Sequence, residues 1–467
     1  MHHASTLTPP STNPAQALAR FAHALTPAAL PQAVRDKSTQ HILDALGLAF
    51  ASNTFPFAGP ALAGIRAAGA PGDATVVGAG MALAPRDAAL ANGYLMHGLD
   101  FDDTHPAAIV HPTVACLPAA LAIGQATDAR WGDVLAAYAA GMETAIRLGR
   151  AVKGGFHHVG FHATGVVSHF SSAVVAGKLL GLTEPQLVAA QGITASTASG
   201  VQVFLETGAW TKRMHPGWGA MAGITAAHMA GAGFHGPDRP YEGKFGFFDA
   251  YLQARAAEVD ADSIAQDLGE HWTLLETAIK PYPVCHFIHG AAEAALALRA
   301  DVADLSQITR IDCELPAQTL PIVAEPHASK ILPRSDYEAK FSAQFVVAAC
   351  LLRGRFTLAE LDDASLADPA ILALAAKVQC AVQADTAFPK YFSGALHVHL
   401  KNGSVLHRHV PMNLGSGDRA LSLDDIAAKF RANAALRLPA ERVEAILQGF
   451  LSTDDATPVR ELARLLG

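Results

Sequence analysis

Apolar residues recur with a helical period over the first part of the chain. From about 15 to 269 they lie three or four residues apart, as Leu18, Phe21 and Leu25 do, and short Gly/Pro breaks separate the segments. End signals predict three helices in this region: one over 134–148 capped by Asp133, one over 168–180 ended by Gly181, and one opened by Thr183.

The pattern changes after about residue 275. Apolar and polar residues alternate over 311–315 and 396–400, which is the period of a half-buried strand. Asn402-Gly403 then leads into a second alternating run over 404–410, so a β-hairpin is expected there. Helical spacing returns over 337–352, between the strands, and over 422–466, where Ser422 can cap the first turn.

These segments predict a mainly α protein: a large all-helical domain interrupted by a smaller α+β lid domain. The first part of the helical domain is expected over 15–275, the lid over 276–412, and the returning helices over 413–467. Residues 1–14 are rich in Pro, Ser and Thr and are predicted to be disordered. A cleft between two domains is a common place for an active site.

Composition excludes several classes of protein. Hydrophobic residues make up 51% of the chain, but no uninterrupted apolar stretch reaches the roughly 18 residues of a membrane span. The net charge of −8, without a basic stripe, argues against a nucleic-acid partner. Five cysteines without CxxC spacing, and a start without a secretory pattern, predict a reduced, cytoplasmic protein.

Polar groups concentrate in HGLDFDDTHPAAIVHP, residues 97–112. If this stretch were helical, Asp100 and Thr104 would share one face, while Pro106 and Pro112 predict an irregular loop that presents His105 and His111. The cluster is compatible with metal binding, with acid–base chemistry, or with simple capping of the loop.

Four further segments carry candidate chemistry: GGFHHVGFHATG (154–165), TKRMHPGWG (211–219), IKPYPVCHFIHG (279–290) and PRSDYEAKFS (333–342). His157 and His162 could bind a metal together with an aspartate, although no ligand pair has diagnostic spacing. Cys285 next to His286 could suggest a thiolate nucleophile, but a small buried cysteine fits better. GAGMAL at 78–83 lacks the last glycine of a dinucleotide fingerprint. The remaining inventory of carboxylates, histidines and cations suits proton transfer beside a bound carboxylate.

Six motifs occur in an order that resembles the MmgE/PrpD family: DFDDTHPAAIVHP, GFHATG, TKRMHPGW, YEGKFGFF, KPYPVCH and YEAKFS. The resemblance covers the chain from about residue 15 to the end. It implies a helical domain with an α+β lid, a homodimer, and activity without a metal or cofactor.

Matching by motif, the resemblance implies nine site residues. The catalytic group comprises Asp100, Thr104, His111, His162, Lys212 and His286; the substrate-binding group comprises Lys280, Arg213 and Lys340. Asp102 and His105 are assigned structural roles. Many members have Arg where this chain has His286, so a fixed cation is replaced by a titratable group.

The resemblance implies a lyase that acts on a small di- or tricarboxylate by general acid–base proton transfer. Family members include 2-methylcitrate dehydratase, cis-aconitate decarboxylase and iminodisuccinate epimerase, and dehydration is favoured here over decarboxylation and epimerisation. A metal hydrolase built on the Asp/His cluster and a non-catalytic family member are the rival hypotheses from other classes.

Overall fold

The computed structural model describes residues 13–467, and its first helix begins at once. In α1 (Pro14–Ala24), the Asn13 side chain accepts hydrogen bonds from the backbone N–H groups of Ala15 and Gln16, which makes Asn13 the N-cap. The disorder predicted over 1–14 is therefore wrong for the last two residues, and residues 1–12 lie outside the described part of the chain.

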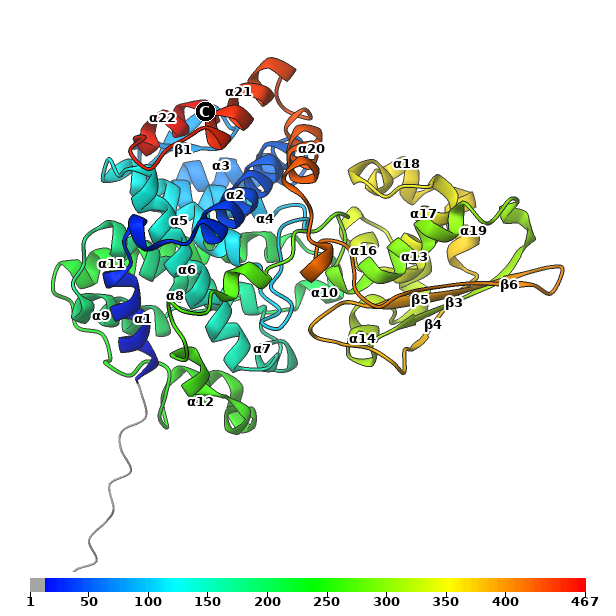
Figure 1. Ribbon diagram of the computed structural model, residues 1–467, viewed down its shortest axis with the longest axis horizontal. Coiled ribbons are helices and arrows are strands. Elements are labelled where there is room, and N and C mark those ends of the chain that lie inside the picture. Colours follow the sequence, from blue (N-terminus) through cyan, green and yellow to red (C-terminus); the bar gives the residue numbers. More distant parts are fainter. Residues whose placement is uncertain (1–12) are drawn as a thin grey trace, which may run out of the picture.

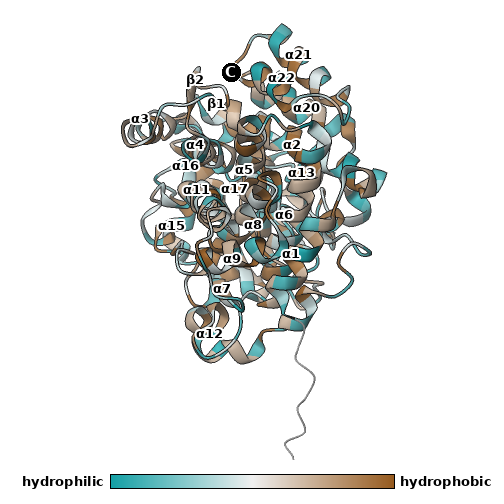
Figure 2. Ribbon diagram, turned by 90° about the vertical axis from the view of Figure 1, so that its left-hand side faces the viewer, coloured by the Kyte–Doolittle hydropathy of each residue, from teal (hydrophilic) through white to brown (hydrophobic). Residues whose placement is uncertain are grey.

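A body of packed helices fills one side of the molecule (Figure 1). Its elements are α1, α2 (Gln32–Ser52), α3 (Ala58–Ala68), α4 (Pro85–His97), α5 (Pro112–Ala126), α6 (Trp131–Ala151), α7 (Gly155–His158), α8 (Ala163–Leu179), α9 (Glu184–Ala195), α10 (Phe204–Thr207), α11 (Thr211–Gly231) and α12 (Phe247–Leu252). Brown hydrophobic residues gather around α5 and α8 in the middle of Figure 2. Helices α4 and α11 pack backbone to backbone, since a Cβ on Gly217 would lie 2.2 Å from the Leu90 carbonyl oxygen.

The α+β part is a four-stranded sheet with helices against it. Its strands are β3 (Ile308–Leu315), β4 (Val378–Val382), β5 (Gly394–Leu400) and β6 (Val405–Val410), and its main helices are α13 (His289–Arg299), α16 (Asp336–Lys340), α17 (Ala343–Arg353) and α19 (Pro369–Ala375). The strand order is β4-β3-β5-β6, with β4 parallel to β3 and the other pairs antiparallel. This part has its own hydrophobic core, separate from that of the helical body.

The chain ends by returning to the helical body with α20 (Leu423–Ala434), α21 (Ala440–Leu451) and α22 (Val459–Leu466), drawn in orange and red in Figure 1. The predicted cap is confirmed: Ser422 and Asp425 form a capping box at the start of α20. Helix α20 packs against α2 and carries Lys429 into the molecule. The C-terminal helices therefore help to build the region where the two cores meet.

The mainly α fold is confirmed, but several predicted elements need correction. Helix α6 begins at Trp131 with Arg130 as its N-cap, so Asp133 lies in the first turn and does not cap it. The helix predicted over 168–180 begins five residues earlier, at Ala163. The helix predicted over 337–352 is two helices, because α16 ends at Lys340 and the Ser342 side chain caps a new helix, α17, by accepting from the N–H of Phe345.

The helical body is also not purely helical. A small antiparallel pair, β1 (Ala74–Val76) and β2 (Met81–Leu83), lies between α3 and α4, with Gly78 and Gly80 at positive φ in its turn. The GAGMAL segment thus forms a tight hairpin. Among residues 13–467, no helix combines the length and apolarity that crossing a membrane requires. The domain limits at 275 and 412 stay predictions.

Candidate active site

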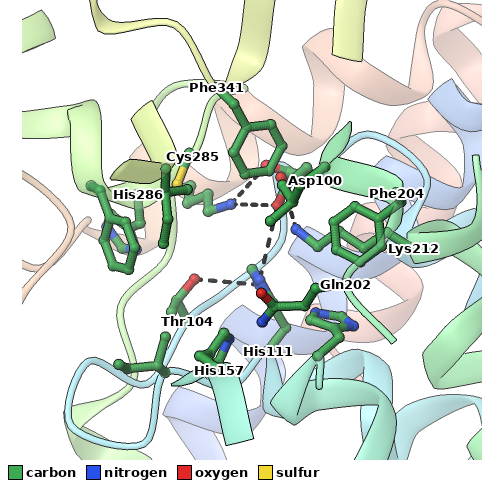
Figure 3. Close-up of a pocket in the computed structure, with 16 residues that line it drawn as sticks. Asp100, Thr104, His111, His157, Gln202, Phe204, Lys212, Cys285, His286 and Phe341 are labelled. Carbon is green, nitrogen blue, oxygen red and sulfur yellow. Dashed lines mark hydrogen bonds and ion pairs between the residues drawn. The ribbon is translucent and has the colours of Figure 1, made fainter. Parts of the chain in front are cut away.

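A pocket lies where the helical body meets the α+β part. In Figure 3, Asp100 lies above Thr104 and His111, with Lys212 and Phe204 on one side and Cys285 and His286 on the other. The polar groups come from the 97–112 loop and from helix ends, while much of the remaining wall is apolar.

Asp100 is the electrostatic centre of this pocket. Its two carboxylate oxygens each accept a hydrogen bond from a buried lysine, Oδ2 from Lys212 Nζ at 3.0 Å and Oδ1 from Lys280 Nζ at 2.9 Å. Asp100 has φ of +51°, a left-handed conformation that aspartate tolerates better than most residues. Asp100 and Thr104 therefore do not share the face of a helix. Thr104 instead makes an isolated β-bridge with Ala278.

Four consecutive backbone carbonyls of the same loop are each held by a buried cation. Arg213 donates to Gly98 O, Lys340 to Leu99 O, Lys280 to Asp100 O and Lys429 to Phe101 O, at distances between 2.7 and 2.8 Å. These cations come from α11, α16, the 280 segment and α20. The position of Asp100 is thus fixed jointly by the helical body, the α+β part and the C-terminal helices.

His111 is the N-cap residue of α5 and faces the pocket. Its Nδ1 lies 2.7 Å from the carbonyl oxygen of Asp103, and a carbonyl can only accept, so Nδ1 carries the hydrogen. The other ring nitrogen, Nε2, is then free of hydrogen and lies 3.9 Å from Asp100 Oδ1. His111 is therefore oriented to exchange a proton with a bound molecule through Nε2.

His162 occupies the matching position at the start of α8. Its Nδ1 lies 3.1 Å from Nδ1 of His215, and its Nε2 is buried without a hydrogen-bond partner in the described structure. Thr164, in the first turn of α8, accepts a hydrogen bond from the backbone N–H of His111 at 3.0 Å. This hydrogen bond connects the N-terminal ends of α5 and α8, which carry His111 and His162.

The charges of these groups follow from burial and from their neighbours. Burial would raise the pKa of Asp100, but Lys212 and Lys280 outweigh it and hold that pKa well below its usual value. Burial lowers the pKa of His111 to about 3, although Asp102 acts in the opposite direction. Burial and Lys212 also lower the pKa of His162 well below its usual value. Around neutral pH Asp100 is therefore ionised, and the imidazoles of His111 and His162 are uncharged.

Comparison with known proteins places this architecture in a family. The model of the MmgE/PrpD N-terminal domain matches residues 16–260, and that of the C-terminal domain matches residues 282–453. The chain belongs to the MmgE/PrpD family. The resemblance predicted from the motif order is therefore confirmed.

Curated members of the MmgE/PrpD family align over nearly the whole chain. Human cis-aconitate decarboxylase is 29% identical over 462 residues, which cover 97% of this chain and 94% of the relative. The cis-aconitate decarboxylase-like protein oryM of Aspergillus oryzae is 25% identical and covers 98% of both chains. A 2-methylcitrate dehydratase of Cupriavidus necator is 26% identical and covers 91% of both.

The structure brings together seven of the nine residues that the MmgE/PrpD resemblance implied. The seven that line the pocket are Asp100, Thr104, His111, His162, Lys212, Lys280 and His286. Arg213 and Lys340 do not line it. The Arg213 guanidinium lies between the rings of Phe57 and Tyr337, and the Lys340 ammonium is fully buried against Leu99 O. The structure places these two cations behind the Asp100 loop, where they hold its backbone.

Other pocket neighbours were not singled out from the sequence. His97, the last residue of α4, lies beside both histidines, with its ring centroid 4.9 Å from that of His111 and 5.5 Å from that of His162. Asp102, assigned a structural role, lies 3.4 Å from His111 Nδ1. In the sequence, His97 and Asp102 are marked as a pair only by their five-residue separation across the end of α4. That separation is not diagnostic of a functional site.

Two groups of side chains have the spacing of a metal site. Donor atoms lie within 4.8 Å of one another in His97, His111 and His162, and again in Asp100, Asp102 and His111. Both groups adjoin the ammonium groups of Lys212 and Lys280, which repel a cation and already occupy the Asp100 oxygens. An anionic group fits this surrounding charge better.

Burial raises the pKa of the Cys285 thiol, which disfavours a thiolate nucleophile.

Buried uncharged histidines predict a stability that falls in acid. His169, fully buried in α8 with Nδ1 donating to Gly165 O, has its pKa lowered by burial from 6.5 to about 4. Between these values the unfolded chain binds the extra proton, so the free energy of unfolding rises with pH and is lost as pH falls. His169→Asn should reduce that slope by about 1.4 kcal/mol per pH unit near pH 5.

Chemical denaturation near pH 5, 6 and 7 measures this slope. The matched control is His228→Asn in α11, where the side chain is exposed, and this variant should keep the wild-type slope. An unchanged slope in His169→Asn would contradict the assignment of a buried, uncharged imidazole.

Proposed function

We propose that this protein is a cofactor-independent lyase that acts on a small polycarboxylate by proton transfer at carbon. The observation that carries the proposal is the pairing of Asp100 with the ammonium groups of Lys212 and Lys280, opposite the ring nitrogens of His111 and His162. Two fixed ammonium groups beside two uncharged imidazoles supply carboxylate binding and proton exchange in one small space.

Substrate carboxylates would bind beside Lys212 and Lys280. His286 can add a third contact, because Asn413 Nδ2 donates to its Nε2 at 3.0 Å, which leaves the hydrogen on Nδ1. A bound polyanion favours protonated histidine, so we expect the pKa of His111 to rise in the complex. His111 Nε2 would then deliver a proton to the substrate carbon, and His162 would serve as the second proton-transfer group.

Decarboxylation is the reaction that we place first. The bond between carbon and one carboxylate breaks, carbon dioxide leaves, and the electron pair moves through a neighbouring double bond to the carbon that takes the proton. Loss of a carboxylate is favoured beside an apolar surface, and the apolar wall comprises Ile109, Phe204, Leu205, Phe287, Ile322 and Phe341. The two relatives with the most complete coverage reported above are also a decarboxylase and a decarboxylase-like protein.

Dehydration, which the sequence favoured, is the second candidate. It is supported by the similarity to a 2-methylcitrate dehydratase and by the presence of two histidines, one for the C–H proton and one for the leaving hydroxyl. Epimerisation of iminodisuccinate would use the same two groups on opposite faces of the substrate.

A panel of three acids distinguishes these reactions. The purified protein is incubated with cis-aconitate, 2-methylcitrate and iminodisuccinate, in buffer with and without a chelator, and products are followed by NMR. We expect turnover of cis-aconitate with release of carbon dioxide, unaffected by the chelator. Turnover of 2-methylcitrate alone would assign dehydration, and loss of activity in the chelator would contradict the cofactor-independent proposal.

A further inference from the structure

A second carboxylate lies behind His111, on the side away from the pocket. Asp102 and His97 are each 1% exposed, and His97 Nδ1 lies 2.8 Å from Asp102 Oδ2. Because an ionised carboxylate can only accept, His97 Nδ1 carries the hydrogen of this contact. His97 Nε2 has no hydrogen-bond partner in the described part of the chain.

The same oxygen of Asp102 also approaches His111. Asp102 Oδ2 lies 3.4 Å from His111 Nδ1, while the hydrogen on that nitrogen points to Asp103 O at 2.7 Å. Asp102 therefore acts on the His111 ring mainly through its charge. Burial would raise the pKa of Asp102, but His111 and His97 outweigh it and hold that pKa below its usual range, so the carboxyl is ionised.

The other charged groups near His111 do not take the place of the Asp102 carboxylate. The charged and titratable groups around its ring include Asp100, Asp102, His97, His162, His286, Lys212 and Lys280. Asp100 is already paired with both lysines, and the lysines and His97 disfavour a positive charge on His111. Asp102 is thus the carboxylate of this group that no ammonium contacts directly in the described structure.

We infer that Asp102 is the counter-ion of the imidazolium that forms on His111 during turnover, and that His97 is the positioning residue that keeps Asp102 in place. The inference rests on the proposed function, in which His111 delivers a proton to carbon. A negative charge fixed behind the ring stabilises the protonated form before transfer. The hydrogen bond from His97 satisfies a carboxylate that would otherwise be buried without a donor.

The pH dependence of kcat, which reports the pKa values of groups in the substrate complex, tests the role of Asp102. Activity that requires protonated His111 falls as pH rises through the pKa of His111, which gives an alkaline limb. Removing an opposite charge at this distance lowers such a pKa by about 1–3 units. In Asp102→Asn the alkaline limb should therefore move to lower pH by that amount, with partial recovery of activity in acid. A lower kcat with an unmoved limb would overturn the counter-ion role.

Two substitutions of His97 test its positioning role. In His97→Asn the amide nitrogen can replace Nδ1 as the donor to Asp102, so the limb should stay near its wild-type position. In His97→Leu the donor is lost and the buried carboxyl takes up a proton more readily, so the limb should move as in Asp102→Asn. If His97→Asn behaves like His97→Leu, the ring Nε2 is needed and the positioning role is overturned.

Asp103→Asn is the matched control for Asp102→Asn. Asp103 is the adjacent buried carboxylate, but its side chain contacts His41 at 2.9 Å and the Thr113 N–H at 3.3 Å and does not face the His111 ring. Its substitution should leave the alkaline limb in place. Thermal melting of each variant monitors folding, and if Asp102→Asn does not fold, the two His97 variants decide the question.

A measurement without substrate separates this inference from the proposed function. In protein labelled with ¹⁵N-histidine, the His97 signals, identified by their loss in His97→Asn, should show hydrogen on Nδ1. An Nδ1 without hydrogen would overturn the His97–Asp102 assignment whatever the substrate. Hydrogen on Nδ1 with no turnover of any acid in the panel would instead count against the proposed function.

Discussion

Replacing His111 with asparagine is expected to lower kcat by about 10²- to 10⁴-fold, the usual contribution of a general acid or base. The asparagine amide can replace Nδ1 as donor to Asp103 O, and asparagine is a favourable N-cap for α5. The substitution therefore keeps the loop and the helix start while it removes the nitrogen that faces the pocket. Steady-state rates with the acid that the panel identifies provide the measurement.

His105→Asn is the control for this prediction. His105 belongs to the same loop and is fully buried, but its Nδ1 accepts a hydrogen bond from the Ala108 N–H and its Nε2 faces Glu276 at 3.6 Å. It does not line the pocket, so kcat should stay close to wild type. Equal losses in the two variants would show that the loop, and not the Nε2 atom of His111, carries the effect.

The largest effect on stability is expected from Asp100→Asn. Asparagine tolerates the positive φ at this position, so the backbone need not change. The carboxylate charge is lost, however, and the ammonium groups of Lys212 and Lys280 remain buried near each other. Breaking a buried ion pair in this way costs about 3–5 kcal/mol of unfolding free energy. Urea denaturation at neutral pH measures the change.

A second substitution shows whether charge is the cause. Lys280→Met removes one of the two ammonium groups, so in the Asp100→Asn background it should restore part of the lost unfolding free energy. In the wild-type background the same substitution should destabilise the protein. Strictly additive losses in the double variant would contradict the electrostatic account of this pair.

Local signals predicted the elements whose ends are fixed by nearby residues. Thr183 forms the capping box of α9 with Gln186, and Asn402-Gly403 connects β5 to β6 in the expected hairpin. The break between α16 and α17 was missed because the hydrophobic period continues across it. There the Ser342 side chain, which caps α17, also donates to the backbone of Lys330, a tertiary contact that no local pattern reveals.

The sequence motifs identified the residues that line the pocket, but they did not identify the residues that hold those pocket residues in position. A motif assigns residue types to a site but does not say which cations face the substrate. Arg213 and Lys340 belong to the same motifs as the pocket residues, and their positions behind Asp100 depend on how α11 and α16 meet the 97–112 loop. His97 is five residues from Asp102 in the sequence. The two side chains meet because helix α4 ends at His97 and the chain turns there, which the sequence pattern did not predict.

The central claim is that this pocket transfers a proton to the carbon of a small polycarboxylate without a metal. Incubation with cis-aconitate in deuterated water containing a chelator, followed by NMR, tests it most directly. The account predicts release of carbon dioxide and an unsaturated dicarboxylate that carries one new deuterium on carbon, with the rate strongly reduced in His111→Asn. Product without deuterium at carbon, or activity that requires an added metal ion, would contradict it.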